Sequence, residues 1–135
     1  MSAVVDAALV ALLQADATLA GLAPGGVYPE MAPEQNSTPY VVVILETHED
    51  VQEENRPAYE QATYLVVAID KADDAAAANA AYGQVHAALT AATLAPSGYH
   101  TMDLVRTGRM RQAERDGSVI WRYVGGRYRW QGHPV

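Results

Sequence analysis

Two apolar runs rich in β-branched residues constrain the fold of this chain more than any other feature. They are residues 40–45 (YVVVIL) and residues 62–69 (ATYLVVAI). Val, Ile, Thr and Tyr fit the pleated surface of a sheet, so each run predicts a strand. A loop can join the two runs directly, so an antiparallel pair is expected. The almost continuous apolarity of the first run indicates burial on both faces or at a subunit contact.

A second pair of strands is predicted near the C-terminus. Asp116-Gly117 is a strong hairpin signal, because the glycine can take the positive φ that a tight turn needs. Residues 101–115 and 118–124 flank this turn and alternate in polarity, as strands with two different faces do. The pair Gly125-Gly126 predicts a second tight turn or a bulge before residues 127–130.

Two helices are expected on the basis of apolar residues at helical spacing. Residues 2–15 form the first, and Asp16 is placed to end it and to cap one further short turn. An alanine-rich segment, residues 72–94, forms the second, with Asp73 or Asp74 as its cap. Its expected buried stripe consists of Ala78, Tyr82, Val85, Leu89 and Ala92.

The resulting order, α-β-β-α-β-β, predicts an α+β fold in which two helices pack on one face of a four-stranded, mainly antiparallel sheet. With 135 residues, the chain is expected to form a single domain spanning residues 1–135, with long loops at 27–39 and 46–60. No segment approaches the ~20 apolar residues of a membrane helix, so no membrane association is expected. The chain has no cysteine, which excludes a disulfide scaffold, a cysteine nucleophile and a thiolate metal site.

Charge is unevenly distributed along the chain. Residues 1–60 carry a net charge of -9, residues 61–105 carry -3, and residues 106–135 carry +5. One interpretation is self-association, in which the acidic front of one copy meets the basic back of the next. The other is a basic patch for nucleic acid, but the overall charge of -7 opposes the attraction that phosphate binding needs.

The segment 46–60 holds six acidic residues and one arginine. Such a segment can be a solvated loop, a divalent-cation site, or a surface that repels DNA. It lacks the glycine and the fixed alternation of a calcium loop, and the four histidines of the chain lack metal-ligand spacing, so we predict no metal and no cofactor. We expect four of the acids to face a partner or a lumen: Glu49, Asp50, Glu53 and Glu54.

The seven arginines of residues 106–135 follow no helical stripe. Arg109 and Arg111 are expected on one strand face, and Arg127 and Arg129 likewise share a face. A solvated sheet face and an intersubunit surface of ion pairs are both consistent with this pattern, and we assign Arg127 and Arg129 to the intersubunit surface. No nucleophile elbow, phosphate-binding loop or dinucleotide motif is present, so no catalytic residue and no enzyme activity is predicted.

The first part of the chain resembles the tail-completion, or tail-terminator, proteins of long-tailed bacteriophages. The resemblance lies in residues 13–22 (LQADATLAGL), in Val27-Tyr28-Pro29, in Ala32-Pro33 and in Pro39-Tyr40-Val41. The later strand, helix and closing hairpin also fit this family. The charge-dense segment 46–60 and the Gly125-Gly126 break depart from its pattern.

The resemblance implies a structural virion protein that forms a ring, typically a hexamer, at the head-proximal end of the tail. Such a ring would assemble in the host cytoplasm, stop growth of the tail tube and offer a docking face to the head–tail connector, or stopper. DNA would pass through without specific binding. Two alternatives stay open: a neighbouring neck component, such as a stopper or head-completion protein, and a small metal-binding module built on the acidic segment.

Overall fold

The computed structural model describes residues 2–34, 36–51 and 59–135. Within these ranges the chain forms three helices and five strands, and none of these helices is long and apolar enough to cross a membrane. The elements are α1 (Ser2–Gln14), α2 (Ala17–Leu22), β1 (Val27–Pro29), β2 (Tyr40–Val51), β3 (Tyr59–Lys71), α3 (Ala76–Ala91), β4 (Tyr99–Asp116) and β5 (Val119–Pro134).

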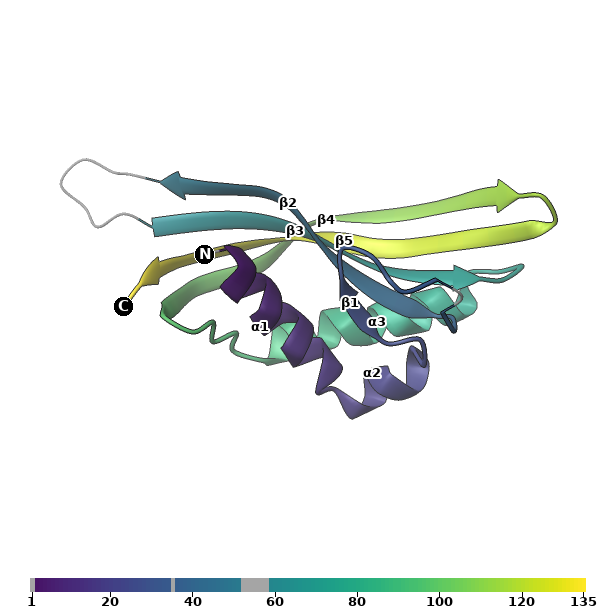
Figure 1. The fold of residues 1–135 in the computed structure, drawn as a ribbon, viewed down its shortest axis with the longest axis horizontal. Helices are drawn as coiled ribbons and strands as arrows, with labels where there is room; N and C mark the ends of the chain where they lie inside the picture. Colours follow the sequence, from purple (N-terminus) through teal and green to yellow (C-terminus); the bar gives the residue numbers. More distant parts are fainter. Residues whose placement is uncertain (1, 35, 52–58) are drawn as a thin grey trace.

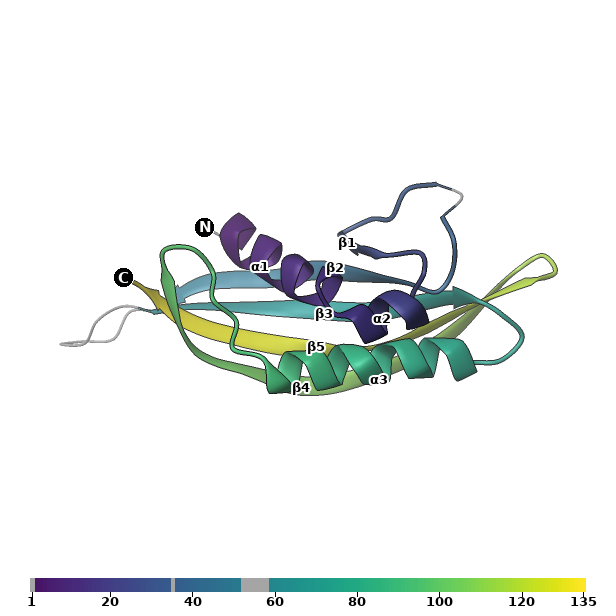
Figure 2. The ribbon, with the colours of Figure 1, turned by 90° about the horizontal axis from the view of Figure 1, so that it is seen from below.

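The strands form one sheet in the order β1-β2-β3-β5-β4. β2 and β3 form one antiparallel hairpin, β4 and β5 form another, and antiparallel pairing of β3 with β5 joins the two. The helices lie on one side of the sheet, and no described helix covers the other side (Figures 1 and 2). The two predicted hairpins and the one-sided helical layer are confirmed, whereas the predicted four strands and two helices fall short by one each.

The additional strand, β1, lies in a segment that was predicted to be an irregular loop. It is only three residues long and pairs in parallel with β2. The amide of Val41 donates to the carbonyl of Gly26 at 2.9 Å, and the amide of Glu30 donates to the carbonyl of Val43 at 2.9 Å. Pro29 is tolerated because β1 is an edge strand and one of its sides needs no donor. The additional helix, α2, is the short turn expected after Asp16.

The predicted loop at 46–60 is too long at both ends, because β2 continues to Val51 and β3 begins at Tyr59. Surface charges do not stop a ladder whose backbone groups pair with each other, and acidic side chains can point to solvent from a strand. The register shifts between Leu45 and Thr47, which places a bulge at Glu46. Glu53 and Glu54 lie outside the described residues.

The prediction of a turn or bulge at Gly125-Gly126 is wrong, since β5 runs through both glycines without interruption. These glycines serve close packing instead. A Cβ on Gly125 would collide with the backbone of Val66 and Val67, and a Cβ on Gly126 would collide with the hydroxyl of Tyr82. A glycine inside a strand is typical of such close approach.

The helix starts agree with the predicted caps in part. The Asp16 carboxylate accepts a hydrogen bond from the amide of Leu19 at 2.8 Å and so caps α2 as expected. α3 begins at Ala76, four residues later than predicted, and no side chain caps it at Ala75. Asp74 instead accepts a bond from the amide of Ala76 at 3.0 Å, which fixes the turn that leads into the helix.

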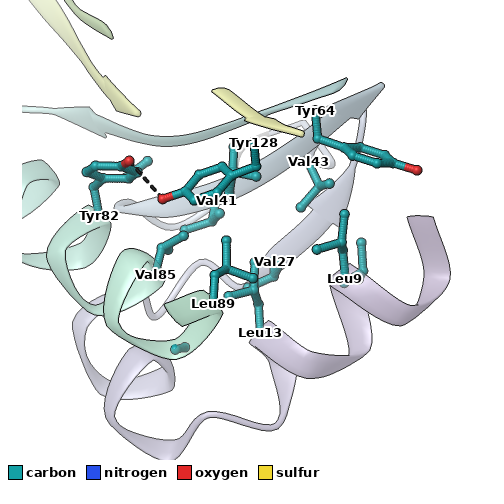
Figure 3. Close-up of a cluster of buried hydrophobic side chains, with 14 of the residues drawn as sticks. Leu9, Leu13, Val27, Val41, Val43, Tyr64, Tyr82, Val85, Leu89 and Tyr128 are labelled. Atoms are coloured by element: carbon teal, nitrogen blue, oxygen red, sulfur yellow. Dashed lines mark hydrogen bonds between the residues drawn. The ribbon is translucent and has the colours of Figure 1, made fainter. Parts of the chain in front are cut away.

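The core lies between the helices and the sheet (Figure 3). Leu9 and Leu13 of α1 are fully buried against it, and so are the aromatic rings of Tyr64, Tyr128 and Trp130. Because the chain contains no phenylalanine, these rings bring polar atoms that need partners. The Tyr64 hydroxyl donates to a carboxylate oxygen of Asp6 at 2.6 Å, and Nε1 of Trp130 donates to the Thr101 hydroxyl at 3.0 Å. The expected stripe of α3 is buried except for Ala92.

Candidate functional site

The first charged surface is the acidic end of the sheet, which we define by Glu49, Asp50 and Glu60. It lies where β2 and β3 approach the segment that joins them (Figure 1). Glu49 and Asp50 are exposed, and Asp50 lies directly opposite Glu60 in the antiparallel register. Like charges at facing positions repel each other, so this end gains from a partner of opposite charge.

His48, Asp50 and Glu60 also form a compact group, with one potential ligand atom from each within 4.8 Å of the others. The sequence alone does not show that these three side chains meet, because Glu60 comes from the other strand of the hairpin. Nε2 of His48 and one carboxylate oxygen of Glu60 are buried without a hydrogen-bond partner. The strand register alone accounts for the proximity of the three side chains, and Asp50 faces solvent.

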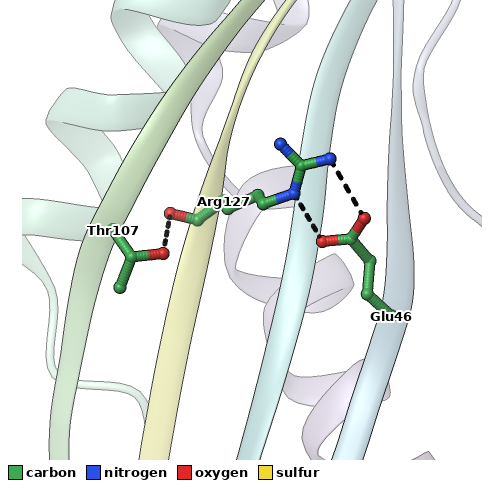
Figure 4. Close-up of polar contacts among 3 residues, drawn as sticks. All are labelled: Glu46, Thr107 and Arg127. Carbon is green, nitrogen blue, oxygen red and sulfur yellow. Dashed lines mark hydrogen bonds and ion pairs between the residues drawn. The ribbon is translucent and has the colours of Figure 1, made fainter.

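Arg127 and Arg129 point to the side of the sheet that lacks helices, as Figure 4 shows for Arg127. Nε of Arg127 lies 2.8 Å from a carboxylate oxygen of Glu46, and the guanidinium also reaches the second oxygen at 3.3 Å. Arg129 lies 3.6 Å from a carboxylate oxygen of Asp103. Both arginines therefore have partners within the chain, and both stay partly exposed.

The second charged surface is a cleft of about 460 Å³ between α3 and β4. We call it the arginine cleft and define it by Arg106, Arg109, Arg111 and His86. Its volume falls within the range of small-ligand sites in proteins. No acidic side chain lines it, and the structure pairs none of the three arginines with a carboxylate among the described residues. The cleft is thus cationic in a chain whose net charge is -7.

A chain of hydrogen bonds forms the floor of the arginine cleft. Arg106 donates to the hydroxyl of Tyr82 at 3.3 Å, the hydroxyls of Tyr82 and Tyr128 are 2.8 Å apart, and Nδ1 of His86 lies 3.0 Å from the Tyr128 hydroxyl. Every group is satisfied when Tyr82 donates to Tyr128 and Tyr128 donates to a neutral His86. Burial lowers the pKa of His86, and the positive charges of Arg106 and Arg109 lower it further. The neutral form is therefore favoured.

The sheet face opposite the helices carries a third surface, an apolar groove of about 540 Å³. Val42 and Val67 form its floor and are each only 3% exposed. The loop after β1 contributes Met31, whose side chain is 79% exposed. The apolarity of residues 40–45 on both strand faces thus has two causes, since one face meets the helices and the other lines this groove.

The sequence predicted part of these surfaces. It placed Arg109 and Arg111 on one strand face, and their pairing opposite Gly126 and Val124 agrees with this. It gave no role to His86, because no sequence pattern shows that α3 lies over β4. The sequence therefore contains no pattern that predicts the arginine cleft.

Comparison with known proteins bears on what these surfaces do. The family described as "Tail completion protein gp17" matches residues 7–124. This chain belongs to the tail completion protein gp17 family. Among curated proteins, no match is found. The structure is similar to a chain in a solved structure described as "Virion of native gene transfer agent (GTA) particle", with a TM-score of 0.67, 25% sequence identity and coverage of 94% of both chains.

Membership of the tail completion family makes this chain a structural component of a phage-like virion, at the tail or at the junction between tail and head. A role in assembly directs attention to surfaces rather than to a reaction centre.

Proposed function

We propose that the protein is a tail terminator, a ring of identical subunits that caps the tail tube and joins the tail to the head connector. The observation that carries the proposal is the family match, which spans residues 7–124 and so includes every described element except the first residues of α1 and most of β5. The similarity to a chain of a virion particle over 94% of both chains supports the same role.

The charge distribution supports a closed ring. A ring of identical subunits requires a heterologous contact, in which two different surfaces of the same chain meet. The acidic end and the arginine cleft are two such surfaces, opposite in charge and on different strand pairs. We propose six subunits per ring, because the chain resembles the tail-terminator proteins, whose rings are typically hexamers.

The proposed partners are the tail tube protein on one side of the ring and the connector or stopper protein on the other. The ring would assemble in the host cytoplasm and stay in the virion at the head-proximal end of the tail. Glu49, Asp50, Glu53 and Glu54 would face a partner or the lumen, where negative charge would keep passing DNA from binding. No cofactor and no reaction enter this role.

Purified particles provide the direct test. The protein should bind isolated tails and should be absent from filled heads without tails, and tails assembled without it should have uncontrolled tube lengths in electron micrographs. Binding to filled heads in preference to tails would instead support the alternative, a stopper or head-completion protein. Native mass spectrometry of the bound protein measures the copy number.

Reversal of Arg127 and Arg129 to glutamate tests their assignment to the subunit interface. We expect weaker ring formation with little loss of monomer stability, because exposed ion pairs such as Arg127–Glu46 contribute only about 0–1 kcal/mol each. The matched control is Arg127→Lys with Arg129→Lys, which keeps both charges. Assembly that is equal in the glutamate and lysine variants contradicts the assignment.

A further inference from the structure

The arginine cleft and the acidic end of the sheet lie too far apart to satisfy each other within one chain. Strand pairing places Glu49 level with Gln61, Gln131 and Asp103 across the sheet. Arg109 and Arg111 lie six and eight residues further along β4, and three strand spacings separate β2 from β4. At roughly 3.3 Å per residue and 4.8 Å per strand, the two surfaces are about 25–30 Å apart.

This separation exceeds the screening length of about 8 Å at physiological salt several-fold, so intrachain attraction between the two surfaces is negligible. Each surface nevertheless carries an unbalanced charge. The arginine cleft has no acidic lining residue, and Asp50 faces Glu60 across the strand pair. Among the described residues, neither surface therefore has a partner of opposite charge in its own chain, and a second copy can supply one.

We propose that the arginine cleft receives the acidic end of a second copy of this chain, so that Asp50 of one copy binds Arg109 and Arg111 of the next, while Glu49, on the opposite face of the same strand, adds negative charge to that end. The contact rests on the proposed ring and adds a second set of residues to the subunit interface to which Arg127 and Arg129 are assigned. It is heterologous, because the donor and acceptor surfaces belong to different hairpins, and such a contact can close into a ring.

The construction of the cleft supports this occupant. Arg106 is held by the hydroxyl of Tyr82, which positions its charge at the floor, while the exposed Arg109 and Arg111 are available at the mouth. Guanidinium groups bind carboxylates through paired hydrogen bonds, and such bonds strengthen when the site excludes water. Carboxylates fixed on a folded protein surface therefore suit the cleft better than the phosphates of a nucleic acid, which the net charge of -7 repels.

Charge exchange between the two surfaces tests the contact. One variant carries Arg109→Glu and Arg111→Glu, and the other carries Glu49→Arg and Asp50→Arg; all four positions are exposed, so thermal melting should show intact folds. Sedimentation velocity at low salt should give self-association at least about ten-fold weaker for each variant alone. An equal mixture of the two variants should restore association through alternating copies. Failure of the mixture to associate while the wild type does would overturn the proposal.

Cysteine trapping provides a measurement that leaves every charge in place and has no background, since the chain lacks cysteine. Val51→Cys lies next to Asp50, and Asn79→Cys lies on the exposed rim of the cleft. Mild oxidation of this double variant, in solution and on tails, should give a ladder of disulfide-linked oligomers. The matched control pairs Val51→Cys with Thr90→Cys, three turns further along α3 and also exposed. No ladder, or equal ladders in both proteins, would contradict the contact.

A DNA-binding role for the same arginines is the competing outcome. Fluorescence anisotropy with a labelled 30-base-pair duplex should show no difference between the wild type and the Arg109→Glu, Arg111→Glu variant. Salt-sensitive DNA binding that only this variant loses, together with normal self-association, would overturn the proposal. The proposed function is tested separately, because a protein that binds tails without the predicted cross-links keeps the terminator role but loses this interface.

Discussion

Substitution of Gly125 by alanine tests whether this glycine is required for packing rather than for a turn. Its backbone is not in the left-handed region, so an alanine has no conformational reason to be excluded. A Cβ there would lie 2.8 Å from Cα and 2.9 Å from Cβ of Val67, and it would also press on the carbonyl of Val66. These are atoms of the neighbouring central strand, which cannot move away as the end of a flexible side chain can.

Two effects of opposite sign set the magnitude. Overpacking in a well-packed interior costs about 1–3 kcal/mol. Replacement of glycine by alanine also reduces the entropy of the unfolded chain, which stabilises the fold by about 0.4–1 kcal/mol. The expected net loss in the free energy of unfolding is therefore about 1–2 kcal/mol for Gly125→Ala.

Gly108→Ala is the matched control, because Gly108 lies on the adjacent strand β4 with no atom within 4 Å of its would-be Cβ. Only the entropic effect applies there, so this variant should equal or exceed the wild type in stability. Urea unfolding followed by tryptophan fluorescence measures both, since Trp130 is fully buried. Equal stabilities of the two variants would refute the packing argument and favour a merely permissive role for the glycine.

Three further predictions concern the polar groups of the core and the cap of α2. Asp16→Ala removes the cap of α2 and the hydrogen bond from Gln84, so urea unfolding should show a free energy of unfolding lower by about 1–2 kcal/mol. Asp73→Ala, at an exposed position, is the control and should change this free energy by no more than about 0.5 kcal/mol. Tyr64→Phe leaves the Asp6 carboxylate without its hydrogen-bond donor and should lower the free energy of unfolding by about 1–3 kcal/mol. The same substitution in an Asp6→Ala background should cost less, and additive losses would contradict a direct hydrogen bond. The folded state lowers the pKa of His86 below 6.5, so near and below that pH the unfolded chain binds more protons than the folded chain. The free energy of unfolding should therefore fall as the pH drops below about 6.5. His86→Gln should flatten this pH dependence, whereas His100→Gln, at an exposed position, should not.

Features that depend on neighbouring residues could be predicted from the sequence. Asp116-Gly117 predicts the β4–β5 turn because a tight turn needs only the backbone freedom of its own residues, and Gly117 indeed has a φ of 63°. Asp16 predicts the start of α2 for the same reason, since its acceptor and the Leu19 amide are three residues apart.

Features that depend on distant residues could not be predicted. Gly125-Gly126 has the composition of a turn, but it pairs with β3 and β4 as a strand, and the approach of Val66 and Tyr82 leaves no room for a Cβ there. β1 is too short to show a pattern, and its existence depends on pairing with β2. The arginine cleft requires His86 to lie over β4, which follows from how α3 packs.

The β4–β5 hairpin extends at one end beyond the layer of helices (Figure 1), and every residue from 111 to 118 is exposed. Amides there can exchange with solvent through local fraying, whereas those beneath α3 exchange only when the whole domain opens. Among the described strands, proteases should therefore cut a free subunit first at this arm, and contact with other virion proteins should slow both exchange and cleavage. The protection of β4 and β5 from amide exchange and proteolysis would therefore measure how far assembly has progressed.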